Sequence, residues 1–224
     1  MRVEPGPQRS DETVTAEDLQ SRYRQVRQQS TALCEPLVIE DFGVQPMDDA
    51  SPPKWHLAHA AWFFETFILK PFTRGYELFH PDFETLFNSY YNGIGKPFPR
   101  AERGLLSRPN LSQVLSYRRH VDSVMSKLLS NDKHPNSDVI TQRCRLGIEH
   151  EKQHQELLHT DIKYSLSRNP LFPAFQKLQP AKPSSNGADN GWCDFPGGLF
   201  GIGVNESPEQ FAFDNEMPEH KVFV

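Results

Sequence analysis

The pattern of apolar and polar positions predicts four helices along the first 170 residues. In residues 111–129, apolar side chains recur at intervals of three or four, as in a helix that buries one face: Val114, Tyr117, Val121, Met125 and Leu128. Residues 15–34 begin with Thr15, which has an acidic residue three positions on as in a loose capping box, and they stop before Pro36. Residues 51–70 begin with a serine cap followed by proline and are strongly apolar.

The fourth predicted helix is the longest. It runs from about Ser137 to Ser167, where the sequence SRNP ends it, and would measure about 45 Å at 1.5 Å per residue. Residues 71–110, between the second and third helices, are aromatic and rich in Gly and Pro, and we expect them to be irregular. No convincing strand interrupts the four helices. The predicted fold is therefore mainly α, an antiparallel four-helix bundle.

The composition changes after Phe175. Residues 176–190 are rich in Pro, Ser, Gly and Asn, which predicts a linker. Residues 191–224 contain short apolar runs separated by Gly and Pro, a pattern typical of strands and turns, but too few residues for an independent domain. We expect a flexible N-terminus in residues 1–14 and a helical domain in residues 15–175. The linker would then lead to an irregular β/loop segment, the truncated start of a second domain.

Charge and cysteine content exclude several classes of protein. The net charge of -5, with scattered basic residues, argues against nucleic acid and anionic membrane as partners. Neither an apolar leader nor a run of roughly 20 apolar residues is found. Cys34, Cys144 and Cys193 are far apart, so neither a disulfide framework nor a thiolate zinc site is indicated. We expect a soluble protein of a reducing cytoplasm.

Candidate chemistry begins with the sequence EHEKQHQELLH, from Glu149 to His159. His150 and His154 are four residues apart, so on a helix they differ by about 40° in direction and about 6 Å in height and can hold one ion. We expect the same helix face to be largely interior. Its other residues are Leu146, Gly147, Leu157, Leu158 and Asp161. The small Gly147 is expected to leave room beside the site.

A histidine pair at this spacing also arises by chance or on a solvated surface. The second predicted helix supplies further candidates, because His56 and His59 occur in the sequence KWHLAHAAWFF among large aromatic residues. An imidazole without a partner is unfavourable in such a core. Histidines from two facing helices form a plausible metal site, and the ligand type leaves Zn, Fe, Cu and Ni open. Zinc would activate water or a thiol, whereas Fe(II) could bind substrate and dioxygen side by side.

Three longer segments carry a resemblance: SPPKWHLAHAAWFFETFIL, FNSYYNGIGKPFPRAERGLLSRP and GIEHEKQHQELLHTDIKYSLSRNPL. Over residues 15–175 the chain resembles the amino-terminal DinB-like domain of the ergothioneine-biosynthesis sulfoxide synthases. The later sequences FPGGLFGIGVN and FDNEMPEHKV resemble the start of the formylglycine-generating-enzyme-like domain that follows in this family. Two different domains, matched in the family's order, make the resemblance more specific than a histidine pair.

The resemblance implies a non-haem iron enzyme. With dioxygen, such enzymes join the thiol of cysteine or gamma-glutamylcysteine to hercynine, a trimethylated histidine, as a sulfoxide. The family's Fe(II) ligands correspond here to His59, His150 and His154. His56 lies outside the ligand motif, and we expect it to be a polar residue of the helix face beside Trp55.

Further residues correspond to substrate contacts of the family. Gln153 in HEKQH lies where the family has a glutamine close to hercynine, although an exposed helical glutamine is the alternative. Arg100 and Arg103 in PRAERG are spaced like two family arginines that bind the carboxylate of the thiol substrate. A guanidinium fork suits a carboxylate because it can donate two parallel hydrogen bonds. The alternative is a pair of solvated loop arginines.

The chain ends at Val224, before the region that carries the family's catalytic tyrosine and most hercynine contacts. We therefore leave the catalytic residue unassigned and expect the chain alone to be unable to turn over. Two alternatives stay open. One is a zinc-dependent DinB-like thiol transferase or hydrolase that uses the same histidines, and the other is a metal-binding fragment without activity.

Overall fold

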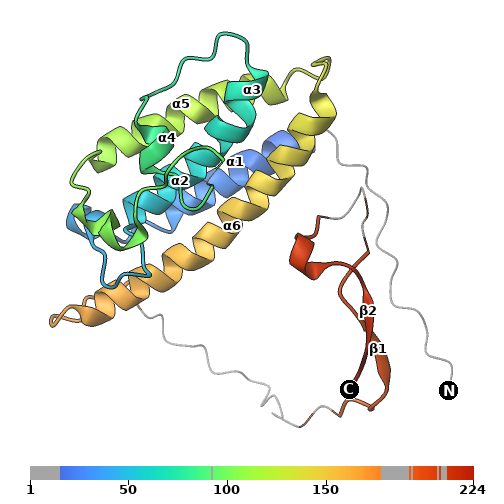
Figure 1. The fold of residues 1–224 in the computed structure, drawn as a ribbon. Helices are drawn as coiled ribbons and strands as arrows, with labels where there is room; N and C mark the ends of the chain where they lie inside the picture. The colour runs from blue at the N-terminus through green and yellow to red at the C-terminus, as the bar shows by residue number, and fades with distance from the viewer. Residues whose placement is uncertain (1–15, 92, 178–191, 193, 206, 208–210) are drawn as a thin grey trace. The chain divides into compact units, whose positions relative to one another are not determined.

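The chain is mainly helical, as its sequence predicts (Figure 1). The computed structural model describes residues 16–91, 93–177, 192, 194–205, 207 and 211–224. The described residues up to Gln176 form one compact unit, and those from Lys177 onward belong to a second. The expected flexible terminus, residues 1–14, lies outside the described residues, as does most of the expected linker, residues 176–190.

Four long helices make up most of the first unit: α1 (Ala16–Ala32), α2 (Pro53–Phe64), α5 (Leu111–Leu129) and α6 (Ser137–Arg168). The helix α2 continues through a π-helical turn, η2 (Glu65–Leu69), into the short α3 (Lys70–Phe72). The remaining short helices are η1 (Ile39–Gly43), α4 (Phe83–Leu86) and η3 (Arg100–Leu105). None of the helices in the described part of the chain combines the length and the apolar character needed to cross a membrane.

The helices α1 and α2 each pack against both α5 and α6 (Figure 1). Every residue of α2 is buried, including both of its histidines. A helix that is apolar on all sides belongs in a core rather than at a surface. The surrounding core contains large aromatic side chains, among them Trp55, Trp62, Phe64 and Tyr117. The position of α2 therefore carries His56 and His59 into the interior of the unit.

The boundaries of α5 agree with the predicted helix at residues 111–129, and all five residues of its apolar stripe are buried. Asn110 caps its first turn, because the Asn110 side chain accepts from the amide of Gln113 while the Gln113 side chain accepts from the amide of Asn110. The start of α2 differs from the prediction by one residue. Pro52 rather than Ser51 precedes the first turn; the Ser51 amide donates to Asp161 at 2.9 Å, and the Ser51 hydroxyl accepts from Arg103 at 2.8 Å.

The described residues of the second unit include an antiparallel hairpin. Its strands are β1 (Leu199–Ile202) and β2 (His220–Phe223), with Leu199 opposite Phe223 and Ile202 opposite His220. A short helix, η4 (Asp214–Glu216), precedes β2. The hairpin agrees with the strand and turn pattern of this segment. That it opens a second domain stays a prediction.

Candidate metal centre

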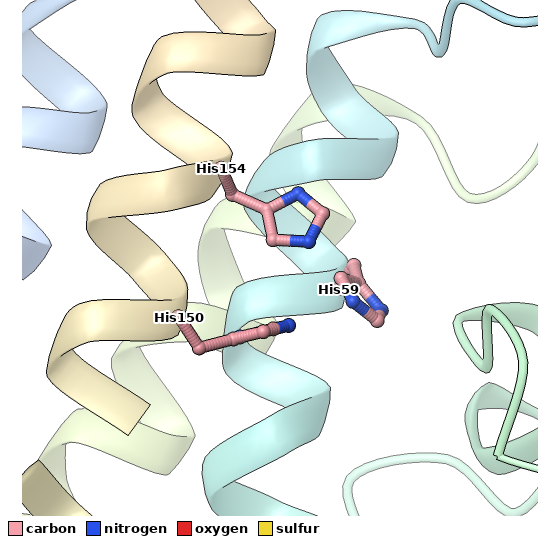
Figure 2. A group of neighbouring side chains, drawn as sticks. All are labelled: His59, His150 and His154. Carbon is pink, nitrogen blue, oxygen red and sulfur yellow. The ribbon is translucent and has the colours of Figure 1, made fainter. Parts of the chain in front are cut away.

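Three histidines from two helices meet inside the first unit. His59 lies on α2, and His150 and His154 lie one turn apart on α6 (Figure 2). One ring nitrogen of each residue lies within 4.8 Å of the others. The structure thus brings together the three residues that the resemblance identifies as iron ligands, and their role as ligands stays a prediction. His56 is not part of this group.

Several ring nitrogens of the cluster are buried and have no partner in the part of the chain that the structure describes. The His59 Nδ1–H donates to the Phe87 carbonyl oxygen at 2.6 Å, which leaves the Nε2 lone pair of His59 free. Both ring nitrogens of His150 are also buried and have no hydrogen-bond partner among the described residues. A buried polar atom left without a partner costs about 1–3 kcal/mol. A metal ion bound between these rings would remove that cost, so the residues fit a metal centre.

Burial keeps the three imidazoles neutral. It lowers the pKa of His150 to about 4. The pKa values of His59 and His154 also lie well below the ordinary value, mainly because of burial and secondly because of the neighbouring histidines. A neutral imidazole has the free lone pair that a metal ligand requires. The ligand-competent form is therefore the one present at pH 7.

Aromatic rings enclose two of the three histidines. The His59 ring stacks on two tryptophans, Trp55, with 4.6 Å between ring centroids, and Trp62, with 5.3 Å. The Phe63 ring stacks on His150 at 4.6 Å. These rings restrict the orientations of His59 and His150. Trp55, Trp62 and Phe63 are themselves buried, so they shield these two histidines from solvent.

Gly147 does not leave room beside the site, contrary to the expectation from sequence. A Cβ atom at this position would lie 2.5 Å from the ring of Phe64 and 3.0 Å from the ring of Phe63. The absence of a side chain at Gly147 instead allows these two rings to approach α6. Phe63 in turn stacks on His150, so the glycine supports the wall of the site.

The expected interior face of α6 is only partly correct. Gly147, Leu158 and Asp161 are buried, but Leu146 is 40% exposed and Leu157 is 45% exposed. At about 100° per residue, the two exposed leucines lie on one flank of the helix rather than at the centre of the buried face. The prediction treated the whole flank as buried because both residues are apolar.

His56 is buried and contacts the cluster without belonging to it. Its ring lies beside Trp55, as expected, with 5.8 Å between ring centroids. However, His56 is more than a polar residue of a helix face. Its Nδ1 lies 3.0 Å from Nδ1 of His154, and its Nε2 lies 3.0 Å from Oδ2 of Asp161. His56 therefore connects a buried carboxylate to one of the three clustered histidines.

A cavity of about 140 Å³ adjoins His154. Its lining includes Arg100, Arg103 and Gln153, the three residues for which the family resemblance implies substrate contacts. Arg100 and Gln153 are exposed, whereas Arg103 is buried. The structure therefore places the three side chains around one space next to the histidine cluster.

Arg103 is not a solvated loop arginine. It donates from Nη1 to Ser51 Oγ at 2.8 Å and from Nη2 to Ser89 Oγ at 3.2 Å, and its guanidinium carbon lies 3.3 Å from the ring centroid of Trp55. Burial and the neighbouring Arg100 lower the pKa of Arg103 to about 9. Among the described residues, Arg103 forms no salt bridge. An anion that entered the cavity could therefore pair with this cation.

The sequence reasoning missed an ionic network behind the histidine pair. Glu151 is 1% exposed and accepts from Arg27 at 3.0 Å, from Arg118 at 3.1 Å and from Ser30 at 2.7 Å. Arg118 also donates to the carbonyl oxygen of Leu57 on α2 at 2.8 Å. The network therefore ties both histidine-bearing helices to α1 and α5.

A signal for this network is present in the sequence. Glu151 lies seven residues after Cys144 and seven before Leu158, so all three occupy the same face of α6. Both neighbours are buried. A carboxylate in such a stripe needs cationic partners, and buried arginines on facing helices supply them.

Comparison with known proteins agrees with this architecture. Residues 22–158 match the DinB superfamily, so the chain belongs to this superfamily. The chain is also 32% identical over 177 residues to a hercynine oxygenase of Mycolicibacterium thermoresistibile. The aligned region covers 78% of this chain and 36% of the relative, so it spans only about a third of the relative's length.

Proposed function

We propose that this chain carries the iron-binding part of a hercynine oxygenase of ergothioneine biosynthesis. The enzyme would use Fe(II) and dioxygen to join hercynine to cysteine or gamma-glutamylcysteine as a sulfoxide. The observation that carries the proposal is a cluster of three neutral imidazoles, two of them buried and the third, His154, half-buried, beside a cavity lined by Arg100, Arg103 and Gln153. The similarity to a protein named hercynine oxygenase supports it.

In this proposal His59, His150 and His154 hold the iron. The unpartnered nitrogens of His59 and His150 support this role, because they are buried and lack any other use among the described residues. Bound Fe(II) would supply dioxygen activation and, with no protein carboxylate among its ligands, would keep positions open for substrates. The stacked rings of Trp55 and Trp62 would hold His59 in place and keep water away from it.

The two arginines would bind the carboxylate of the thiol substrate. Arg103 is anchored by two serine hydroxyls and by the face of Trp55, so little conformational freedom is lost when it receives an anion. Arg100, exposed at the same cavity, would add a second positive charge. Gln153 would contact hercynine from α6.

The finer domain structure is part of the same proposal. We interpret α1, α2, α5 and α6 as an antiparallel DinB-like four-helix bundle within residues 15–175. Residues 191–224, with the hairpin β1–β2, would begin a formylglycine-generating-enzyme-like domain after a linker at residues 176–190. The family's catalytic tyrosine belongs to that domain, so we assign no catalytic residue in this chain. We expect the enzyme to act in the cytoplasm.

The first test is metal and substrate binding by the chain itself. Loaded with Fe(II) without oxygen, it should retain one iron ion per chain and bind cysteine or gamma-glutamylcysteine in calorimetry. Arg103→Gln should weaken thiol binding by a factor of about 10 or more, since a hydrogen bond to a charged group contributes about 1.5–3 kcal/mol. Arg100→Gln, at an exposed site, provides a variant that should fold normally. Arg119→Gln, on the exposed side of α5, is the matched control.

The second test concerns the reaction. A polypeptide that extends into the proposed second domain, given Fe(II), dioxygen, hercynine and the thiol, should form a product whose mass matches the sulfoxide. Iron binding with no such product would argue against the proposed reaction. Selective retention of zinc, with thiol chemistry that does not need dioxygen, would favour the zinc-dependent transferase or hydrolase instead.

A further inference from the structure

A line of hydrogen bonds leads from a buried carboxylate to the metal centre. Asp161 Oδ2 accepts from the Ser51 amide at 2.9 Å and lies 3.0 Å from His56 Nε2. On the other side of the same ring, His56 Nδ1 lies 3.0 Å from Nδ1 of His154. His56 is 4% exposed and Asp161 is 9% exposed, so water does not compete strongly for these contacts.

The positions of the protons follow from the chemistry of the groups. A carboxylate oxygen only accepts, so the contact with Asp161 places a proton on Nε2 of His56. A neutral imidazole that carries its proton on Nε2 has a lone pair on Nδ1, so Nδ1 of His56 can only accept. The contact between the two Nδ1 atoms then requires a proton on Nδ1 of His154. The remaining nitrogen of His154, Nε2, has a free lone pair.

We infer that His56 is a positioning residue of the metal centre: with Asp161 it fixes His154 in the tautomer and orientation that present Nε2 as a ligand atom. The inference rests on the proposed function, because it takes the three clustered histidines as the metal ligands. His56 acts through His154 and does not contact the ion.

His59 has a comparable arrangement. Its Nδ1–H donates to the Phe87 carbonyl oxygen, which likewise leaves Nε2 free. His150 differs, because neither of its ring nitrogens has a partner among the described residues and the ring is held by stacking on Phe63. Partners that orient a metal-bound histidine change metal affinity by about 10–100-fold when removed. We expect the contact with His56 to have an effect of this size.

The test compares two replacements of His56. His56→Leu removes both hydrogen bonds, and its affinity for Fe(II), measured anaerobically by competition with a chelator, should fall by about 10–100-fold. His56→Gln retains an oxygen that can accept from His154 and an amide that can donate to Asp161, and should recover most of the lost affinity. His120→Leu is the matched control, because His120 is a half-buried histidine that contacts Tyr76 and Phe79 rather than the cluster.

A spectroscopic measurement separates positioning from a general structural effect. Long-range proton–nitrogen NMR correlations of the metal-free chain report which nitrogen of each histidine carries the proton. In the unaltered chain, His154 should carry it on Nδ1. In His56→Leu the spectrum should show a mixture of both tautomers, and in His56→Gln it should return to the Nδ1–H form.

The outcomes distinguish this inference from the proposed function. If His59→Ala retains full iron affinity, the metal site itself is wrong. If His59→Ala loses iron while His56→Leu binds it as tightly as the unaltered chain, the metal site stands and the role of His56 is refuted. Should His56→Leu fail to fold, the unaltered chain still decides the question, because a proton on Nε2 of His154 would overturn the proposed arrangement.

Discussion

Replacing Glu151 with glutamine should destabilise the helical unit by about 3 kcal/mol at pH 7. Glutamine keeps the size of the side chain but removes the charge that faces Arg27 and Arg118. Arg27 retains Asp122, which accepts from its Nε at 2.7 Å. Arg118 has no other carboxylate partner among the described salt bridges, so its buried charge would be left uncompensated.

The magnitude also follows from the acidity of Glu151. Burial alone would raise the pKa of its carboxyl group, but Arg27 and Arg118 hold that pKa at about 2, against an ordinary value of 4.5. A difference of this size corresponds to about 3 kcal/mol. Because the pKa is lower in the folded state, this stabilisation is complete above about pH 4.5 and is lost as the pH falls towards 2. The stability difference between chain and variant should narrow over the same interval.

The assay is urea unfolding followed by helical circular dichroism, with a chelator present so that bound metal does not contribute. The variant should unfold at lower urea with an unchanged m-value. Glu156→Gln is the matched control, because Glu156 lies exposed on the same helix and its replacement should change stability by less than about 0.5 kcal/mol. A loss below about 1 kcal/mol in Glu151→Gln, with the m-value unchanged, would refute the reasoning.

Three further expectations concern metal, packing and thiols. Bound metal should raise the melting temperature, since free metal at 100 times Kd stabilises the native state by about 2.7 kcal/mol. If a sample shown to contain iron has the same melting temperature after the iron is removed by a chelator, this expectation is wrong. Gly147→Ala should cost about 1–3 kcal/mol in urea unfolding because its Cβ would overlap the ring of Phe64, whereas Gly43→Ala, with no atom within 4 Å of its Cβ, should be nearly neutral. Burial raises the pKa of Cys34 and Cys144 to about 12, so both should resist iodoacetamide at pH 8 until the chain is denatured, as peptide mass spectrometry can show.

The helix boundaries were predictable where local chemistry determines them. The apolar stripe and the Asn110 cap define α5, and α6 begins at Ser137 and ends one residue beyond the predicted stop. The start of α2 was less predictable, because Ser51 uses its amide and its hydroxyl in contacts with Asp161 and Arg103, which are distant in the sequence. The π turn after α2 could not be predicted from the spacing of apolar positions either, because that method assumes a constant helical period.

The candidate site also has one feature that is local in the sequence and therefore predictable, and others that depend on long-range packing. The spacing of His150 and His154 on one helix is local, so it could be read from the sequence, whereas their meeting with His59 depends on how α2 packs against α6. The contact of His56 with Asp161 joins residues 105 positions apart, and no local pattern predicts it. The sequence shows only that each residue lies on the same face of its helix as a candidate ligand.

The enclosure of the histidine cluster has a consequence for the order of events at the site. His154 lines the cavity, while His59 and His150 are shut in by the stacked rings of Trp55 and Phe63. An ion would therefore enter and leave through this cavity, the same space in which we propose that substrates bind. A molecule bound to Arg103 would block this route, and its residence time would set how quickly the ion can be exchanged.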